Sequence, residues 1–202
     1  MLLYDSKVAP NPRRVRIFLA EKGIEVPTRQ VDIGTAESRK PHFLAKNPLG
    51  ALPVLELDDG TCIAESVAIC RYFEEVQPSP PLMGTDARDR AIVEMWSRRT
   101  ELELWRYVTG CFQHTHAYFA GRIEQVPAWG ELCRKTARER LAWLDRELAE
   151  RPFVAGPRYT IADITLLCAI DFGRVVEIRI APEQRHLARW HEAVSSRPSA
   201  KA

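Results

Sequence analysis

In the first third of the chain, the spacing of apolar residues changes several times between the alternation typical of strands and the three-to-four-residue spacing typical of helices. An apolar stripe at helical spacing ends at Gly23, a residue typical of helix C-termini. Asp58-Asp59-Gly60 separates two short apolar runs, which is a strong hairpin signal. The predicted elements are strands at 2–4, 26–33, 54–57 and 61–63 and helices at 12–22 and 65–75, with a further short helix before the hairpin. This order predicts a small mixed α/β sheet covered by helices.

The rest of the chain shows helical patterns and no convincing strand alternation. Residues 160–176 are the most apolar stretch, so we expect them to form the central, buried helix. The predicted helices span 86–119, with a kink or break near Gly110, then 129–150, 160–176 and 183–196. We therefore expect an α/β N-terminal domain followed by an all-α C-terminal domain.

A proline-rich stretch separates the two patterns. Residues 77–85 contain three prolines and a glycine, which helix and strand interiors do not tolerate. The predicted organisation is a first domain at 1–76, a linker at 77–85 and a helical domain at 86–202. A length of 202 residues accommodates two domains of this size.

Composition and charge argue against several classes of protein: nucleic-acid-binding, membrane-spanning, secreted and metal-binding. The formal net charge is +2, which is too small to indicate a nucleic-acid-binding surface. No apolar run reaches the roughly 20 residues of a membrane span, and the N-terminus lacks the pattern of a signal peptide. The five cysteines form no CxxC pair and have no clustered histidines, so we expect no metal site and free thiols in a reducing cytoplasm.

Pro53 stands at the mouth of a predicted strand, where it cannot donate to a sheet. If the Leu52–Pro53 bond is cis, the N–H and C=O of Leu52 face outward and can pair with an extended peptide ligand. The alternative is an ordinary loop proline.

Glu65 and Ser66 open a predicted helix, where unpaired N–H groups attract anions. Ser66 and these N–H groups can hold a carboxylate while Glu65 pairs with an adjacent ammonium group. An amino-acid head group, such as the γ-glutamyl end of glutathione, carries both charges. Simple helix capping is the alternative.

Thr160 and Asp163 have the spacing of a capping box, with Asp163 as the third residue after the N-cap. We interpret both residues as structural and assign Asp163 no catalytic role.

The segment NPLGALPVLELDDGTCIAESVAICRYF, residues 47–73, resembles the glutathione-binding stretch of soluble glutathione S-transferases. Phe153-Val154-Ala155-Gly156 and Thr160-Ile161-Ala162-Asp163 resemble the capping motif of the same family's helical domain. The resemblance covers nearly the whole chain and implies a thioredoxin-like N-terminal domain, a helical C-terminal domain and a homodimer. It also implies that Pro53 is cis, that Leu52 pairs with the cysteinyl backbone, and that Glu65 and Ser66 hold the γ-glutamyl end. Lys40 then lies near the glycyl carboxylate, with Lys46 as its rival.

A transferase of this kind stabilises the thiolate of glutathione, because a free thiol with a pKa near ~8.5 is mostly protonated at neutral pH. The family places a hydroxyl or other donor between the first strand and the first helix. Ala9 occupies the position where we expect that hydroxyl. Asn11, whose amide is a neutral donor, and Ser6 are the catalytic candidates, and Asn11 can equally be an N-cap.

A hydrophobic co-substrate is expected beside the long helix that follows the linker. Trp105, Val108 and Phe112 share one face of that helix and are the candidate contacts. Core packing is the alternative for each. The leading prediction is an enzyme that conjugates glutathione to hydrophobic electrophiles or carries out a glutathione-dependent reduction. A non-catalytic interaction module and a ligand carrier of the same fold are the alternatives.

Overall fold

The computed structural model describes residues 1–202, which divide into two compact units. Unit 1 comprises Met1–Leu82 with Pro198–Ala202, and unit 2 comprises Met83–Arg197. The sequence had assigned the last five residues to the helical domain. They belong to unit 1 because Arg13 donates to the Ala200 carbonyl at 3.0 Å and the Ser199 hydroxyl bonds to Glu21.

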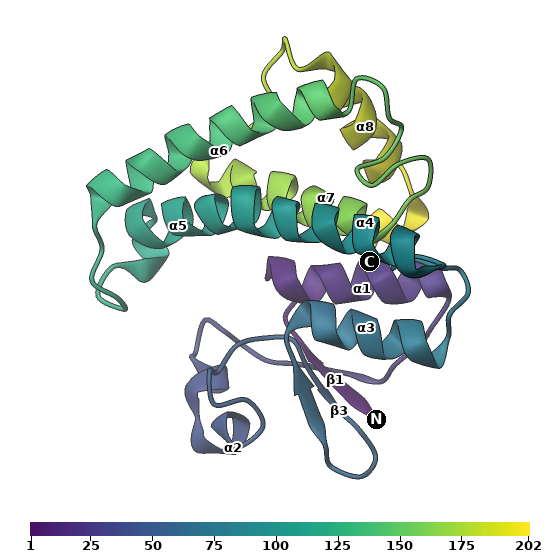
Figure 1. The fold of residues 1–202 in the computed structure, drawn as a ribbon. Coiled ribbons are helices and arrows are strands. Elements are labelled where there is room, and N and C mark those ends of the chain that lie inside the picture. The colour runs from purple at the N-terminus through teal and green to yellow at the C-terminus, as the bar shows by residue number, and fades with distance from the viewer. The chain divides into compact units, whose positions relative to one another are not determined.

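Unit 1 contains a four-stranded mixed sheet in the order β2-β1-β3-β4. Its central strands, β1 and β3, are labelled in Figure 1. Its strands are β1 (Leu2–Asp5), β2 (Thr28–Gln30), β3 (Val54–Glu56) and β4 (Cys62–Ala64), and its helices are α1 (Pro10–Lys22), α2 (Pro41–Leu44) and α3 (Ser66–Val76). Strand β1 runs parallel to β2 and antiparallel to β3, and β3 and β4 form the predicted hairpin. The predicted order of elements is confirmed, although β2 is shorter than the alternating segment 26–33.

The two faces of the sheet are covered differently. Phe43 of α2 packs with Tyr4, Val31 and Val54 on one face. Leu3, which alternates with Tyr4 along β1, is buried on the other side of the sheet. Helices α1 and α3 pack against each other and run side by side in Figure 1. This pairing brings the N-terminal turns of two helices together in unit 1.

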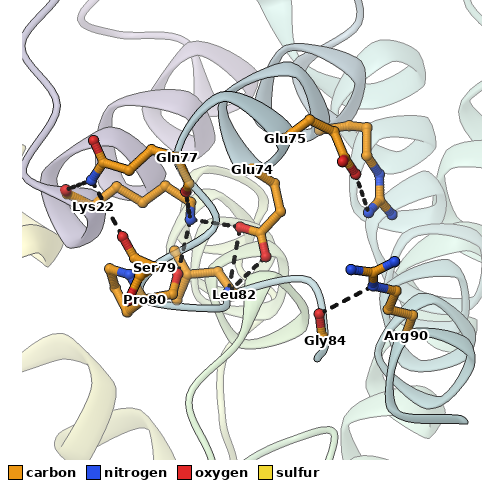
Figure 2. A network of polar contacts seen from close by, with 10 residues as sticks. Lys22, Glu74, Glu75, Gln77, Ser79, Pro80, Leu82, Gly84 and Arg90 are labelled. Atoms are coloured by element: carbon orange, nitrogen blue, oxygen red, sulfur yellow. Dashed lines mark hydrogen bonds and ion pairs between the residues drawn. The ribbon is translucent and has the colours of Figure 1, made fainter. Parts of the chain in front are cut away.

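Residues 77–82, expected as a free linker, are attached to unit 1 by a buried ion pair (Figure 2). Lys22, at the C-terminal end of α1, lies 2.7 Å from a carboxylate oxygen of Glu74, and its side chain is fully buried. The same ammonium group donates to the carbonyls of Gln77 at 2.7 Å and Pro80 at 2.8 Å. Glu74 also accepts from the backbone N–H of Leu82 at 3.1 Å. Each charge is thus surrounded by partners, as a buried ion pair requires.

Unit 2 is helical, as predicted. Its helices are α4 (Ala87–Thr100), a π-helical turn (Glu101–Trp105), α5 (Arg106–Thr115), α6 (Pro127–Glu147), α7 (Ile161–Gly173) and α8 (Arg185–Ser195), with short 3-10 turns at Ala117–Phe119 and Arg174–Val176. Helix α7 packs against α4, α5 and α8, and Ile161–Ile170 are buried without exception. No helix in the chain is long and apolar enough to cross a membrane.

The predicted break near Gly110 is wrong. Helix α5 continues through Gly110, and the irregular turn lies upstream at Glu101–Trp105. A Cβ atom at position 110 would lie 2.9 Å from the Cys133 sulfur of α6. The glycine therefore permits close packing of α5 on α6 rather than a break in the helix.

Thr160 and Asp163 form a capping box at the start of α7. Asp163 is completely buried and accepts hydrogen bonds from the backbone N–H of Val154 at 2.8 Å and of Thr160 at 2.9 Å. It also accepts from Nε1 of Trp190 in α8 at 2.8 Å. Burial raises the pKa of this carboxyl to about 6, against the lowering effect of these donors.

Candidate functional site

The candidate residues of unit 1 converge because of the register of the sheet. Tyr4 of β1 pairs with Val54 of β3, and Val54 pairs with Ala64 of β4. The residues one step further along each strand are Asp5, Pro53 and Glu65. The start of the β1–α1 turn, the Leu52–Pro53 peptide and the N-terminus of α3 therefore lie at one edge of the sheet.

Pro53 is buried, and the Leu52–Pro53 bond is cis. The loop before it is held by Asn47, whose side chain donates to the Ala51 carbonyl at 2.9 Å and accepts from the Leu49 N–H at 3.1 Å. Gly50 has a φ of 59°, and a Cβ there would meet the Ser38 carbonyl at 2.8 Å. Only glycine suits this loop, whose fixed shape positions the Leu52 backbone.

Glu65 and Ser66 lie where β4 passes into α3. Glu65 is exposed and has a φ of 66°, an uncommon conformation for a residue with a side chain and one found at ligand sites. No side chain caps α3, so the N–H groups of its first turn face outward unpaired within the helix. Ser66 Oγ accepts a hydrogen bond from Nη1 of Arg14 at 2.9 Å. The arrangement favours binding of an anion, because the N-terminus of α3 carries a partial positive charge and the nearby guanidinium group is also positive.

The first turn of α1 contains an exposed amide side chain, that of Asn11. Two residues of the first turn of α1, Pro10 and Pro12, have no N–H group, and no side chain caps this helix. Asn11 between them is exposed and carries both a backbone N–H and a side-chain amide. Ser6 is only 4% exposed. Asn11 is therefore the more accessible of the two predicted donors.

The two candidate lysines differ in their surroundings. Lys46 lies 2.8 Å from Glu56 Oε1, and Glu56 Oε2 accepts from the Tyr4 hydroxyl at 2.6 Å. The hydrogen bond with Glu56 raises the pKa of Lys46. Lys40, at the N-cap of α2, is exposed, and its ammonium group takes part in no ion pair. Lys40 is thus free to meet a ligand carboxylate, whereas Lys46 already has one.

Comparison with known proteins decides the family. Residues 8–76 match the model of the glutathione S-transferase N-terminal domain, and residues 109–198 match that of the C-terminal domain. The chain belongs to the glutathione S-transferase family. It is 38% identical to glutathione S-transferase 2 of Saccharomyces cerevisiae over 205 residues, which cover 100% of this chain and 88% of that protein. The family is one of transferase enzymes, so the expected fold and enzyme class are confirmed.

Solved structures agree with this family assignment. The crystal structure of Gtt2 from Saccharomyces cerevisiae has a TM-score of 0.95 and 37% identity and covers 100% of this chain and 99% of that one. A glutathione S-transferase domain-containing protein from Marinobacter aquaeolei has a TM-score of 0.94 and 40% identity, with 98% and 99% covered. Members of the family act on glutathione, which is the ligand to test against the edge described above.

The candidates for the hydrophobic co-substrate of this family member lie in unit 2. Val108 is 1% exposed and Trp105 is 7% exposed, which favours core packing for both. Phe112 is half-buried and packs edge to face with Phe119 at 5.2 Å and with Phe172 at 4.9 Å between ring centroids. Of the three, Phe112 is the one with surface left for a ligand.

The residue of the site that sequence reasoning missed is Arg14. It is 1% exposed, although α1 contains four more charged residues that read as an ordinary polar face. No local pattern distinguishes Arg14 from its neighbours Arg13 and Arg16. No cluster of His, Cys, Asp or Glu side chains in the structure is arranged to hold a metal ion.

Proposed function

We propose that the chain binds glutathione at the edge of the unit 1 sheet and activates its thiol for attack on hydrophobic electrophiles. The observation that carries the proposal is the sheet register, which aligns Asp5, Pro53 and Glu65. In this proposal Ser66 and the first turn of α3 hold the γ-glutamyl carboxylate, and Glu65 pairs with the neighbouring ammonium group. The backbone of Leu52 pairs with the cysteinyl residue as an added strand would. Lys40 meets the glycyl carboxylate.

Asn11 is the proposed donor to the sulfur. Its side-chain amide and the N-terminus of α1 both favour a negative charge, and a thiolate is stabilised by such neighbours. The absence of side-chain capping at this helix and the exposure of Asn11 support the role. Ser6 is the second candidate and is less exposed than Asn11.

A lowered pKa of the glutathione thiol makes the thiolate available as a nucleophile at neutral pH. The thiol proton leaves to solvent, and the sulfur lone pair forms a C–S bond with an electrophilic carbon. The electron pair that is displaced leaves with a leaving group or moves onto a conjugated acceptor. We place the apolar part of the electrophile against Phe112.

The proposal extends to assembly and location. We infer a homodimer, as the membership of the glutathione S-transferase family implies. We infer a cytoplasmic location, supported by five cysteines that are all free thiols.

Calorimetric titration with glutathione, combined with ultraviolet titration of the bound thiolate, tests the core of the proposal. We expect binding and a thiol pKa below the ~8.5 of a free thiol. We also expect conjugation of a chlorodinitrobenzene. Binding with an unshifted thiol pKa would favour a carrier or interaction module, and no binding would refute the glutathione site.

Two variants identify the donor. Asn11→Ala should raise the bound thiol pKa and lower kcat/KM by about tenfold or more, the range expected for a hydrogen bond to a charged group. Asn11→Asp keeps the shape but replaces the donor by a negative charge, so it should be worse than Asn11→Ala. Ser6→Ala is the matched comparison and should leave the thiol pKa unchanged. The reverse result would assign the donor to Ser6.

A further inference from the structure

Arg14 is buried beneath the proposed binding edge and contacts it through the hydroxyl of Ser66. Its side chain extends from the first turns of α1, and Nη1 lies 2.9 Å from Ser66 Oγ across 52 residues of sequence. Arg14 is 1% exposed and Ser66, next to the exposed Glu65, is 5% exposed, so the guanidinium group is the less accessible of the two. The contact that links Arg14 to this subsite is the one with Ser66.

The chemistry of this contact determines where the hydroxyl proton points. A guanidinium group has donors and no acceptor, whereas a serine hydroxyl has one proton and two lone pairs. Ser66 Oγ must accept from Arg14, and its own proton is directed elsewhere. The exposed side of Ser66 borders the first turn of α3, whose N–H groups have no side-chain cap. A carboxylate at this position receives the hydroxyl proton together with the helix N–H groups.

We propose that Arg14 is a positioning residue that fixes the Ser66 hydroxyl as a donor and thereby makes this subsite selective for a carboxylate. The inference rests on the proposed function, since it concerns the subsite assigned to the γ-glutamyl α-carboxylate. Without Arg14, the hydroxyl rotates freely, and the helix N-terminus accepts neutral groups with less discrimination. The positive charge of Arg14 strengthens the preference, because it polarises the hydroxyl toward the anion.

Two cysteinylglycine peptides separate this role from a purely structural one. γ-Aminobutyryl-cysteinylglycine is glutathione without the α-carboxylate, and glutaryl-cysteinylglycine is glutathione without the ammonium group. Each is titrated by calorimetry against the wild type, Arg14→Met and Ser66→Ala. Arg14→Met keeps most of the apolar volume of the side chain while removing its donors. Arg71→Met, at a partly exposed arginine on α3, is the control.

We expect Arg14→Met to weaken binding of glutathione and of the glutaryl peptide about tenfold, as expected for one hydrogen bond to a charged group. Binding of the γ-aminobutyryl peptide should change less than about twofold by the same reasoning. In conjugation assays the loss should appear in the KM for glutathione, with kcat nearly unchanged. Adding Ser66→Ala to Arg14→Met should cause little further loss, because the two residues act as one unit.

Equal weakening of all three peptides by Arg14→Met, or additive effects of Arg14→Met and Ser66→Ala, would overturn the inference and leave Arg14 with a structural role. If Arg14→Met does not fold, Arg14→Lys, which retains the charge and a donor, should keep the wild-type preference for the peptides that carry the carboxylate, and loss of that preference would overturn the inference. Failure of the wild type to bind glutathione would refute the proposed function itself. The wild-type titration therefore separates the two failures.

Discussion

Replacement of Asp163 by asparagine tests the account of the helical unit most directly. Oδ1 accepts from Val154 N–H and Trp190 Nε1, both at 2.8 Å, and Oδ2 accepts from Thr160 N–H at 2.9 Å. Asparagine has nearly the same shape, but one of these oxygens becomes an NH₂ group. In either orientation, a buried donor then faces another donor.

The cost follows from these contacts. The least damaging orientation places the NH₂ group toward Thr160, whose N–H and hydroxyl both donate to Oδ2 in the wild type. The hydroxyl can turn to accept from the NH₂ group, but the N–H loses its partner while buried, at about 2–4 kcal/mol. The variant avoids burying a charge, a gain of about 3 kcal/mol if burial raises the pKa of Asp163 from 3.8 to about 6. The pKa of about 6 already includes the favourable effect of the three donors on the charged form, so the loss of charge assistance adds no separate cost. The expected net destabilisation is therefore about 2 kcal/mol near pH 4.5, where the gain is only about 1 kcal/mol, and it falls to about zero near pH 7.

Thermal unfolding followed by circular dichroism measures this effect. For a chain of this size, about 2 kcal/mol at pH 4.5 corresponds to a Tm lower by roughly 4–8 °C. Glu150→Gln, the same chemical change at an exposed position, should leave Tm unchanged. A Tm for Asp163→Asn within about 2 °C of the wild type at pH 4.5 would refute the claim that the carboxyl group organises this region.

Three further predictions follow from the same structure. Because the folded-state pKa of Asp163 lies above its unfolded value, the wild type gains stability at low pH and loses it as the pH rises through about 6. The difference in free energy of unfolding between wild type and Asp163→Asn should thus be about 2 kcal/mol smaller near pH 7 than near pH 4.5, as measured by urea unfolding. Lys22→Met leaves Glu74 buried without its ion-pair partner and should lower the free energy of unfolding by about 3–5 kcal/mol. Adding Glu74→Gln should recover part of that loss in urea titrations, and no recovery would contradict the role of the pair. Gly110→Ala should destabilise by about 1–3 kcal/mol despite the better helix propensity of alanine, because its Cβ meets the Cys133 sulfur. Combined with Cys133→Ala, its cost should fall, and a cost that is independent of residue 133 would show that the close contact is not the cause.

Much of unit 1 was predictable because its signals are local. The Asp58-Asp59-Gly60 turn lies between β3 and β4, and the stop at Gly23 follows α1 as expected. The boundaries of β2 were less accurate, because alternation at 26–33 continues beyond the three residues that pair with β1. Among the candidate site residues, Pro53, Glu65 and Ser66 belong to one continuous motif and could be read together.

The sequence does not predict the role of a residue when that role depends on a contact with a distant segment. Gly110 looked like a helix breaker, and only the position of Cys133 on α6 shows why a side chain is excluded there. Arg14 looked like one of several surface arginines. Its partner Ser66 lies 52 residues away, and no periodicity within α1 reports that contact.

The sequence by itself determined the order of strands and helices, the helical character of the second unit and the family motifs, because periodicity, turn residues and caps act over a few residues. Only the tertiary structure decided which side chains meet. Sheet register aligned Asp5, Pro53 and Glu65 at one edge, and the packing of α1 on α3 placed the Arg14 guanidinium group behind Ser66. Burial decided the chemistry of Asp163, since the pKa of a carboxyl depends on the atoms that surround it in the folded chain.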